Sequence, residues 1–213
     1  MQVLKSRTRW VALASVMLWG SLAGCAQHQV AQSGFLDNYA QLTPSPLVQG
    51  ALAYTKPGMS LSQYDKFIVE PISIHFAPNA EGVTIAPAQL ARLAQYLEDE
   101  AVKALSERYQ VVLSPGPGVL RLRVAITDIK KGNPLLNLYP GTKLSGVGLG
   151  SASMEGEAID SMTGERILAA VETRRGEALS LEGVGVFDNA KQAMRYWIKR
   201  FVKRLDEAHG YSQ

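Results

Sequence analysis

Cysteine and histidine are scarce in this sequence. Among 213 residues there are one cysteine, Cys25, and three dispersed histidines. A single thiol cannot form an intramolecular disulfide, and these four side chains match no spacing of zinc ligands. Only His75 lies near the predicted core, between Ile74 and Phe76, where a hydrogen-bonded structural histidine is the favoured interpretation. We therefore expect no metal, no cofactor and no catalytic residue in this protein.

The chain also has little net charge of either sign. Lysine and arginine number 22 against 19 acidic residues, but Lys5, Arg7 and Arg9 lie in the first 24 residues, which contain no acid. The remainder carries 19 charges of each sign. Because affinity for a phosphate backbone comes from a surplus of basic residues, this balance argues against nucleic acid as a partner.

The hydrophobic run near the N-terminus is too short to cross a bilayer. Trp10 to Leu22 provides thirteen mostly apolar residues after a short basic segment, whereas a membrane-spanning helix needs about 17 to 25. A run of this length behind basic residues is typical of the apolar region of a secretory signal peptide. We therefore predict a signal peptide over residues 1–24.

The residues after this run give Cys25 a use. Leu22-Ala23-Gly24-Cys25 resembles the bacterial lipobox, and the resemblance implies a diacylglycerol on the Cys25 thiol, with acyl chains such as palmitate. At about 0.8 kcal/mol for each buried methylene, two or three chains hold a protein firmly on a membrane. Ala26 stands where an Asp would resemble the inner-membrane retention signal. The resemblance thus favours the outer membrane, with the protein facing the periplasm.

Residues 25–48 are predicted to form a lipid-anchored tether, and residues 49–210 a single domain. The tether is rich in Gln, with Gly, Pro and Thr and only scattered apolar residues. Phe35, Leu36 and Tyr39 interrupt it. We expect these three side chains to dock together, as one short turn, on the domain.

Hydrophobic periodicity predicts an α+β fold. The predicted elements are a strand over 64–76, a helix over 87–108, strands over 109–113 and 119–129, a hairpin of strands over 151–160 and 165–179, and a helix from an N-cap at Asp188 to Gly210. In the first strand the apolar residues expected on one face are Ile68, Ile72, Ile74 and Phe76. This order favours a single mostly antiparallel sheet with two helices packed on one face.

The segment from Lys131 to Leu144 is predicted to be a long loop with an unusually apolar middle. Its apolar residues are Leu135, Leu136, Leu138 and Tyr139. Loops of this length in compact domains are often functional. We therefore expect these four side chains either to contact an envelope protein partner or to fold back as a lid on the core.

Two acidic residues on one strand raise the possibility of catalysis. Glu155 and Glu157 lie on one strand face about 7 Å apart, within the range of the paired carboxylates of glycosidases. The favoured interpretation is structural: cross-strand ion pairs on an exposed polar face would use both, together with Arg121, Arg123, Glu172 and Arg174.

The last predicted helix carries a basic face. Its basic residues are Lys191, Arg195, Lys199, Arg200, Lys203 and Arg204, opposite Trp197 and Phe201. A helix of this kind can lie on an anionic membrane, and Lys191, Arg195, Lys199 and Lys203 are the candidates for that contact. The alternative is an ordinary solvated face.

Several loose motifs resemble a family of Gram-negative lipoproteins of unknown function, DUF 3313. They are the lipobox, Ser33-Gly34-Phe35-Leu36, the segment Asp160 to Glu165 with Leu168-Ala169-Ala170, and Arg174-Arg175. The resemblance implies a lipoprotein of the outer membrane or periplasm with no assigned activity. Together with the residues, it favours a non-catalytic binding or scaffolding module. The alternatives are an auxiliary subunit of an envelope transporter and an envelope carbohydrate hydrolase.

Overall fold

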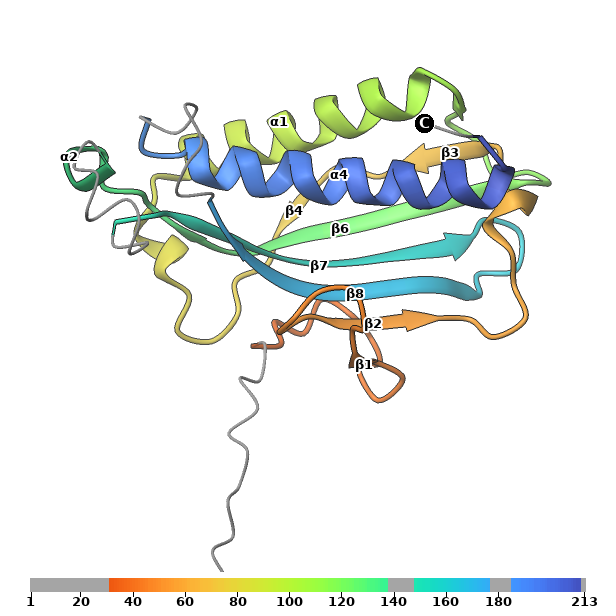
Figure 1. The fold of residues 1–213 in the computed structure, drawn as a ribbon, viewed down its shortest axis with the longest axis horizontal. Coiled ribbons are helices and arrows are strands. Elements are labelled where there is room, and N and C mark those ends of the chain that lie inside the picture. Colours follow the sequence, from red (N-terminus) through yellow and green to blue (C-terminus); the bar gives the residue numbers. More distant parts are fainter. Residues whose placement is uncertain (1–30, 138–147, 177–184, 212–213) are drawn as a thin grey trace, which may run out of the picture.

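Two long helices cover one face of an eight-stranded sheet in the computed structural model, which describes residues 31–137, 148–176 and 185–211 (Figure 1). Across the sheet the strands are β1 (Thr43–Pro44), β2 (Leu52–Thr55), β8 (Arg166–Arg175), β7 (Ser151–Asp160), β6 (Val119–Lys130), β3 (Lys66–Val69) and β5 (Gln110–Val111), and β4 (Ser73–Ile74) also pairs with β6. β3, β4 and β5 pair in parallel, and the other neighbours are antiparallel. The predicted α+β class is confirmed.

The two long helices begin and end close to the predicted residues. α1 (Pro87–Ser106) has Pro87 in its first turn, where the missing N–H costs no helical hydrogen bond. α4 (Asp188–His209) ends at Gly210, which adopts a left-handed φ of 73°. Its N-cap is Phe187 rather than the predicted Asp188, which is the first helical residue. Shorter elements are η1 (Leu61–Gln63), η2 (Glu81–Thr84) and α2 (Pro134–Asn137).

The strand predicted over residues 64–76 is two strands, β3 and β4. Pro71, which has no N–H to donate, lies between them and ends the first strand. Phe67 in β3 is fully buried in the core beneath the helices, whereas Ile68 pairs with Arg121 and faces the other side of the sheet. The prediction that Ile68 shares a face with the later apolar residues is therefore wrong, because the break at Pro71 changes the alternation.

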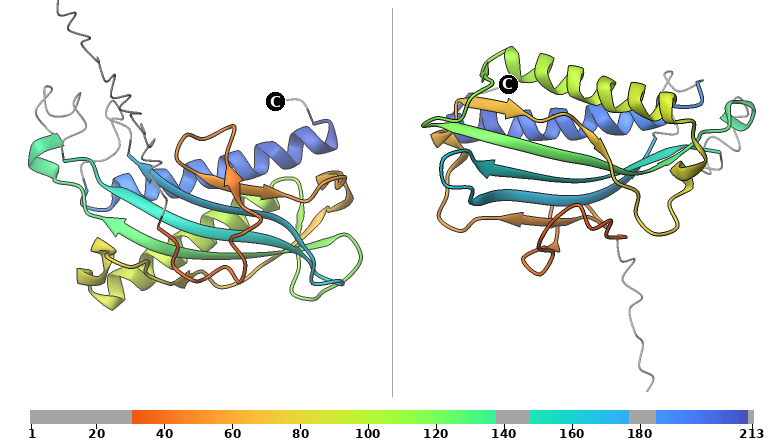
Figure 2. Two further views of the ribbon diagram at one scale, coloured as in Figure 1. Left: turned by 90° about the horizontal axis from the view of Figure 1, so that it is seen from below. Right: turned by 180° about the vertical axis from the view of Figure 1, so that it is seen from behind.

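The N-terminal segment covers the face of the sheet opposite the helices. Seen from below, residues 33–44 cross the central strands (Figure 2). Leu36 is 2% exposed and packs against Ala169 and Val171 of β8, with Phe35 and Tyr39 beside it. The predicted docking of these three side chains is confirmed, and the described part of the predicted tether lies on the domain.

Two apolar clusters join the helices to the sheet. One lies at the N-terminal halves of α1 and α4 and includes Leu97 and Trp197, and the other includes Leu105 and Leu168. A third apolar cluster lies under the N-terminal segment. The buried residues of all three clusters lie between residues 36 and 205 of the chain. A chain that begins at residue 26 therefore contains the whole described core. In the described ranges, no helix has the length and apolar character of a membrane span.

Candidate functional site

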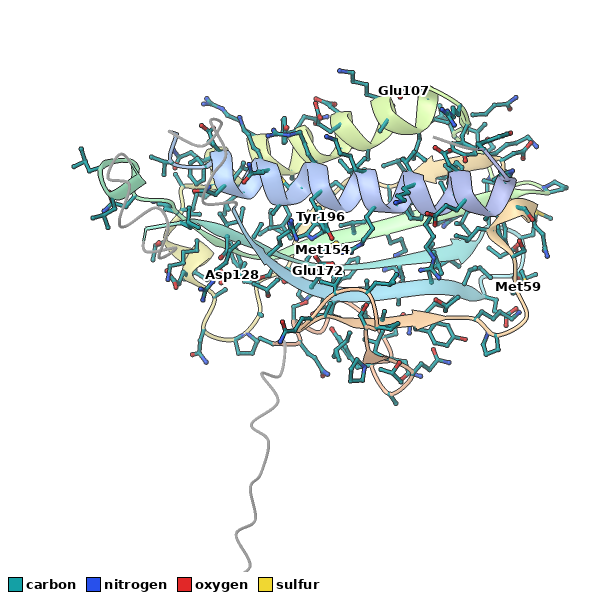
Figure 3. All side chains as sticks on the ribbon, viewed as in Figure 1. Met59, Glu107, Asp128, Met154, Glu172 and Tyr196 are labelled. Carbon is teal, nitrogen blue, oxygen red and sulfur yellow. The ribbon has the colours of Figure 1, made fainter. Side chains whose placement is uncertain are left out.

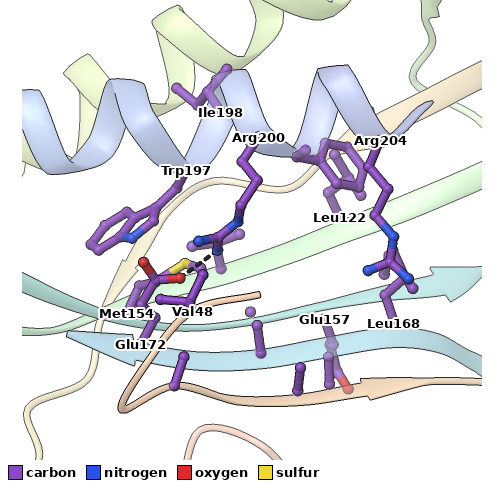
Figure 4. Close-up of a pocket in the computed structure, with 18 of the residues that line it drawn as sticks. Val48, Leu122, Met154, Glu157, Leu168, Glu172, Trp197, Ile198, Arg200 and Arg204 are labelled. Atoms are coloured by element: carbon purple, nitrogen blue, oxygen red, sulfur yellow. Dashed lines mark hydrogen bonds and ion pairs between the residues drawn. The ribbon is translucent and has the colours of Figure 1, made fainter. Parts of the chain in front are cut away.

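A cavity of about 570 Å³ lies between α4 and the sheet (Figure 4). Its lining joins the two apolar clusters, because it includes Leu97 and Trp197 of the first and Leu105 and Leu168 of the second. The walls are mainly apolar. Its volume falls in the range of about 300 to 1,000 Å³ that is typical of small-molecule sites.

Small side chains on three neighbouring strands create the cavity. Ala53 of β2 pairs with Ala170 of β8, which pairs in turn with Gly156 of β7. Residues paired directly across strands share a face, so these three form one row beneath α4. None of them carries more than a methyl group. The sheet therefore does not fill the space under the helix at this row.

The cavity is open to solvent. Leu122, Val124, Met154 and Ala170 lie on central strands beneath α4, yet each is only half-buried. The exposed part of the lining marks the opening, between the β1–β2 loop, where Leu47 is 76% exposed, and the end of α4 that carries Lys203 and Glu207. Apolar floor residues thus contact water through this opening.

Three polar side chains meet at the inner wall of the cavity. Glu172 of β8 is 1% exposed, and its Oε2 accepts a hydrogen bond from Arg200 Nη2 of α4 (Figure 4). The remaining atoms, Glu172 Oε1, Arg200 Nη1 and Trp197 Nε1, are buried without a hydrogen-bond partner in the described part of the chain. Unpaired buried polar atoms are costly. These three atoms lie within the cavity wall rather than on its open surface, because a water-sized molecule does not reach them.

Two arginines at the cavity, Arg200 and Arg204, differ in how far a nearby carboxylate balances their positive charge. Burial alone would lower the pKa of the Arg200 guanidinium, but the hydrogen bond and charge of Glu172 raise that pKa above its ordinary value. Burial, and then the positive charge of Arg200, lower the pKa of Arg204. Arg204 Nη2 donates to the hydroxyl of Thr55 at 2.8 Å. Arginine stays protonated under all ordinary conditions, so both cations persist.

An aromatic ring extends this polar cluster toward the surface. Tyr196 lies near Met154 and Glu172, between α4 and the sheet (Figure 3). The guanidinium carbon of Arg174 is 3.4 Å from the centre of the Tyr196 ring, and that of Arg200 is 5.2 Å from it. Stacking of this kind fixes a guanidinium in place.

The prediction that Glu172 and Arg174 share an exposed face with the other charges is wrong. Glu172 pairs with Met154, whereas its neighbour Val171 pairs with Glu155. Glu172 therefore points toward α4, and Glu155 toward the N-terminal segment. The two residues of β8 do alternate with their neighbours, but they lie on the face that α4 covers.

The other predicted charges do meet on the opposite face. Arg123 forms ion pairs with Glu70 at 3.6 Å and with Glu157 at 2.6 Å. Arg166 also binds Glu157 at 2.7 Å, and Arg121 lies 3.5 Å from Glu70. A cross-strand ion pair is therefore confirmed for Arg123 and Glu157, but Glu157 is buried rather than on an exposed face. Arg121 binds Glu70 rather than one of the predicted partners.

Glu155 lies beneath the N-terminal segment rather than on an exposed surface. It is fully buried, and its carboxylate accepts a hydrogen bond from the Ser33 N–H at 2.6 Å and another from the Tyr39 hydroxyl. Glu155 thus fixes the docked segment, and Glu157 is bound by two arginines. Both carboxylates have structural roles, and only Glu157 is among the residues that line the cavity under α4 (Figure 4).

The predicted partner-contact loop is described only in part. Residues 134–137 form the short helix α2, where Leu135 is 74% exposed and Leu136 is half-buried. Leu138 and Tyr139 lie outside the described residues, as does Cys25. Contact with a partner through this loop stays a prediction.

Two of the four predicted membrane-facing residues contact α1 instead of extending into solvent. Lys191 Nζ lies 5.0 Å from the ring centre of Tyr96, and Arg195 donates to the Tyr96 hydroxyl at 2.7 Å. Lys199 and Lys203 are exposed, and Lys203 lies 3.8 Å from Glu207. No group of three metal-ligating side chains occurs among the described residues.

The cavity is the feature that sequence reasoning missed. The apolar stripe of α4 and the alternation of the strands predict core packing alone. A signal was present in Gly156, Ala158 and Ala170, small residues at the alternate positions that face α4. The prediction that Arg200 and Arg204 lie opposite Trp197 and Phe201 is wrong, because all four residues line the cavity.

The fold and cavity together define an α+β domain with a ligand-sized, open site beneath its C-terminal helix. The chain belongs to the family described as "Protein of unknown function (DUF3313)", which matches residues 31–201. This confirms the resemblance noted in the sequence. Residues 31–201 include most of the cavity, with Trp197 and Arg200 among them.

Known proteins resemble the chain at low identity. The uncharacterized lipoprotein YdcL of Escherichia coli is 28% identical over 193 residues, which cover 82% of this chain and 86% of YdcL. Among solved structures, the PelC dodecamer of Paraburkholderia phytofirmans is 17% identical with a TM-score of 0.44, covering 73% of this chain and 95% of that one. A Xanthomonas campestris protein of family DUF330 is 14% identical with a TM-score of 0.41, covering 70% and 86%.

Proposed function

We propose that the protein is a lipid-anchored lipoprotein of the bacterial envelope whose folded domain is a non-catalytic binding module. Cys25 carries the lipid, and the domain faces the periplasm from the outer membrane. The lipobox resemblance of residues 22–25 and the lipoprotein name of its relative YdcL support the anchor. The binding site is the cavity between α4 and the sheet.

The observation that carries this proposal is the open, apolar cavity floor. Ala170, Val124 and Leu122 lie on central strands beneath a helix, where complete burial is the rule, yet they remain half-buried. Water against such a surface costs about 25 cal/mol for each Å². A ligand with an apolar body would remove that cost.

Blocking the cavity is expected to abolish the binding of an apolar probe. In Ala170→Phe the added ring points into the empty space under α4, because Ala170 lines the cavity in the middle of the row of small residues. The chain 26–213 should bind N-phenyl-1-naphthylamine with a saturable rise in probe fluorescence. Ala170→Phe should lower that rise at least tenfold.

Ala91→Phe is the matched control, because Ala91 lies on the exposed side of α1 and does not line the cavity. It should bind the probe as the parent does. Urea unfolding of both variants shows that they are folded. If the parent does not bind the probe saturably, or if Ala170→Phe binds it as well as Ala91→Phe does, the cavity is not the binding site.

A further inference from the structure

We propose that the ligand of this cavity is a single-chain amphiphile with a compact anionic headgroup, whose acyl chain lies under α4 and whose headgroup binds Arg204. This inference rests on the proposed function, because it needs the cavity to be a binding site. It adds the chemical class of the ligand and the residue that selects it.

The walls favour an acyl chain. The lining runs from the β1–β2 loop, under α4, to Leu97 and Leu105 of α1 on the far side of the helix. It is therefore continuous from the opening into the space between the two helices. Its side chains are mainly aliphatic, which suits a flexible hydrocarbon chain. The volume of about 570 Å³ suits one small molecule.

The opening favours a negative headgroup, because one cation there forms no ion pair with a carboxylate of the described residues and feels Glu207 only through its charge. Arg204 lines the cavity and is half-buried, and its side chain donates to the neutral hydroxyl of Thr55. Within the described residues, no carboxylate lies within ion-pair distance of Arg204. A half-buried cation whose hydrogen-bond partner is neutral is less stabilised than one in an ion pair, and an anion that hydrogen-bonds to it offsets that cost.

The neighbouring charges are already paired. Arg200, one helical turn before Arg204, is bound by Glu172 at the inner wall. Lys203, the residue directly before Arg204, has its Nζ 3.8 Å from Oε1 of Glu207. Arg204 is therefore the basic residue at the opening that can bind a carboxylate or a phosphate with both of its terminal nitrogens. Arg200 and Arg204 both extend from α4 toward the sheet (Figure 4).

Photo-crosslinking on the full chain tests this inference. Envelopes that carry the full-length protein are incubated with a diazirine derivative of dodecanoic acid or with the same derivative of dodecanol. After illumination, mass spectrometry measures labelling of the peptides that line the cavity. Titration gives the half-saturating concentration of each probe. Each variant is compared with the parent for the same probe, so the loss of probe into the membrane affects both values equally.

Arg204→Gln is expected to raise the half-saturating concentration of the acid about tenfold, which is the typical effect of losing a charge-assisted contact. It should change that of the alcohol less than twofold, and retained alcohol labelling shows that the cavity is intact. Lys199→Gln, which removes an exposed charge of α4 outside the lining, should change neither value.

The outcomes separate this inference from the function on which it rests. Alcohol and acid labelling that respond equally to Arg204→Gln, or not at all, would overturn the anionic headgroup and leave the binding cavity standing. Failure of both probes to label the cavity peptides of the parent would overturn both proposals. Selective weakening of the acid in Arg204→Gln supports both.

Discussion

Replacing Arg200 by Ala is expected to lower the free energy of unfolding by about 3 kcal/mol or more. The substitution leaves the Glu172 carboxylate, which is 1% exposed, without the cation that binds it. Removing one partner of a buried ion pair typically costs about 3 to 5 kcal/mol, because the other charge stays buried and unpaired. Urea unfolding followed by circular dichroism measures the change.

Two further variants identify the cause. Lys203→Ala breaks an ion pair on the same helix whose two side chains are both mostly exposed, so it should cost less than about 0.5 kcal/mol. The double variant Arg200→Met with Glu172→Leu removes both charges, and it should recover most of the loss. An Arg200→Ala protein as stable as Lys203→Ala would show that the pair does not hold α4 on the sheet.

Replacing Cys25 by Ser is expected to abolish lipidation, so that the protein is no longer processed and fractionated as the parent is. The oxygen of serine cannot receive the thioether-linked diacylglycerol that the lipobox resemblance implies. The variant therefore lacks the acyl chains, each buried methylene of which contributes about 0.8 kcal/mol to membrane attachment. Fractionation of cells and the mass of the purified protein measure the change.

Ala26→Asp is the matched control for this variant. It keeps the Cys25 thiol and introduces the residue that resembles the inner-membrane retention signal. We expect it to stay lipidated and membrane-bound, but to move to the inner-membrane fraction. The lipoprotein assignment would be wrong if Cys25→Ser were processed and sedimented with membranes as the parent does.

Much of the fold could be predicted because its signals are local. The three- and four-residue spacing of Leu90, Leu93 and Leu97 gave the face that α1 buries. Pro87 and Gly210 set a helix start and a helix end through their backbone chemistry alone. Alternation likewise found the strands of the β7–β8 hairpin.

The site could not be predicted because it depends on register between distant segments. Ala53, Gly156 and Ala170 are unremarkable in sequence, and only the pairing of β2, β8 and β7 aligns them under α4. Alternation placed Glu172 on one of two faces without showing which face the helix covers. The sequence also does not show that residues 33–44 bury Glu155, because the residues in contact lie more than a hundred positions apart in the chain.

Trp197 provides the most direct test of the binding module. The other two tryptophans, Trp10 and Trp19, lie in the predicted signal peptide, so the chain 26–213 has a single tryptophan that lines the cavity. Titration with 12-bromododecanoic acid should quench its fluorescence saturably at one molecule per chain, since bromine quenches on contact. Ala170→Phe should abolish that quenching. Quenching that never saturates, or that is unchanged in Ala170→Phe, would contradict a ligand site beneath α4.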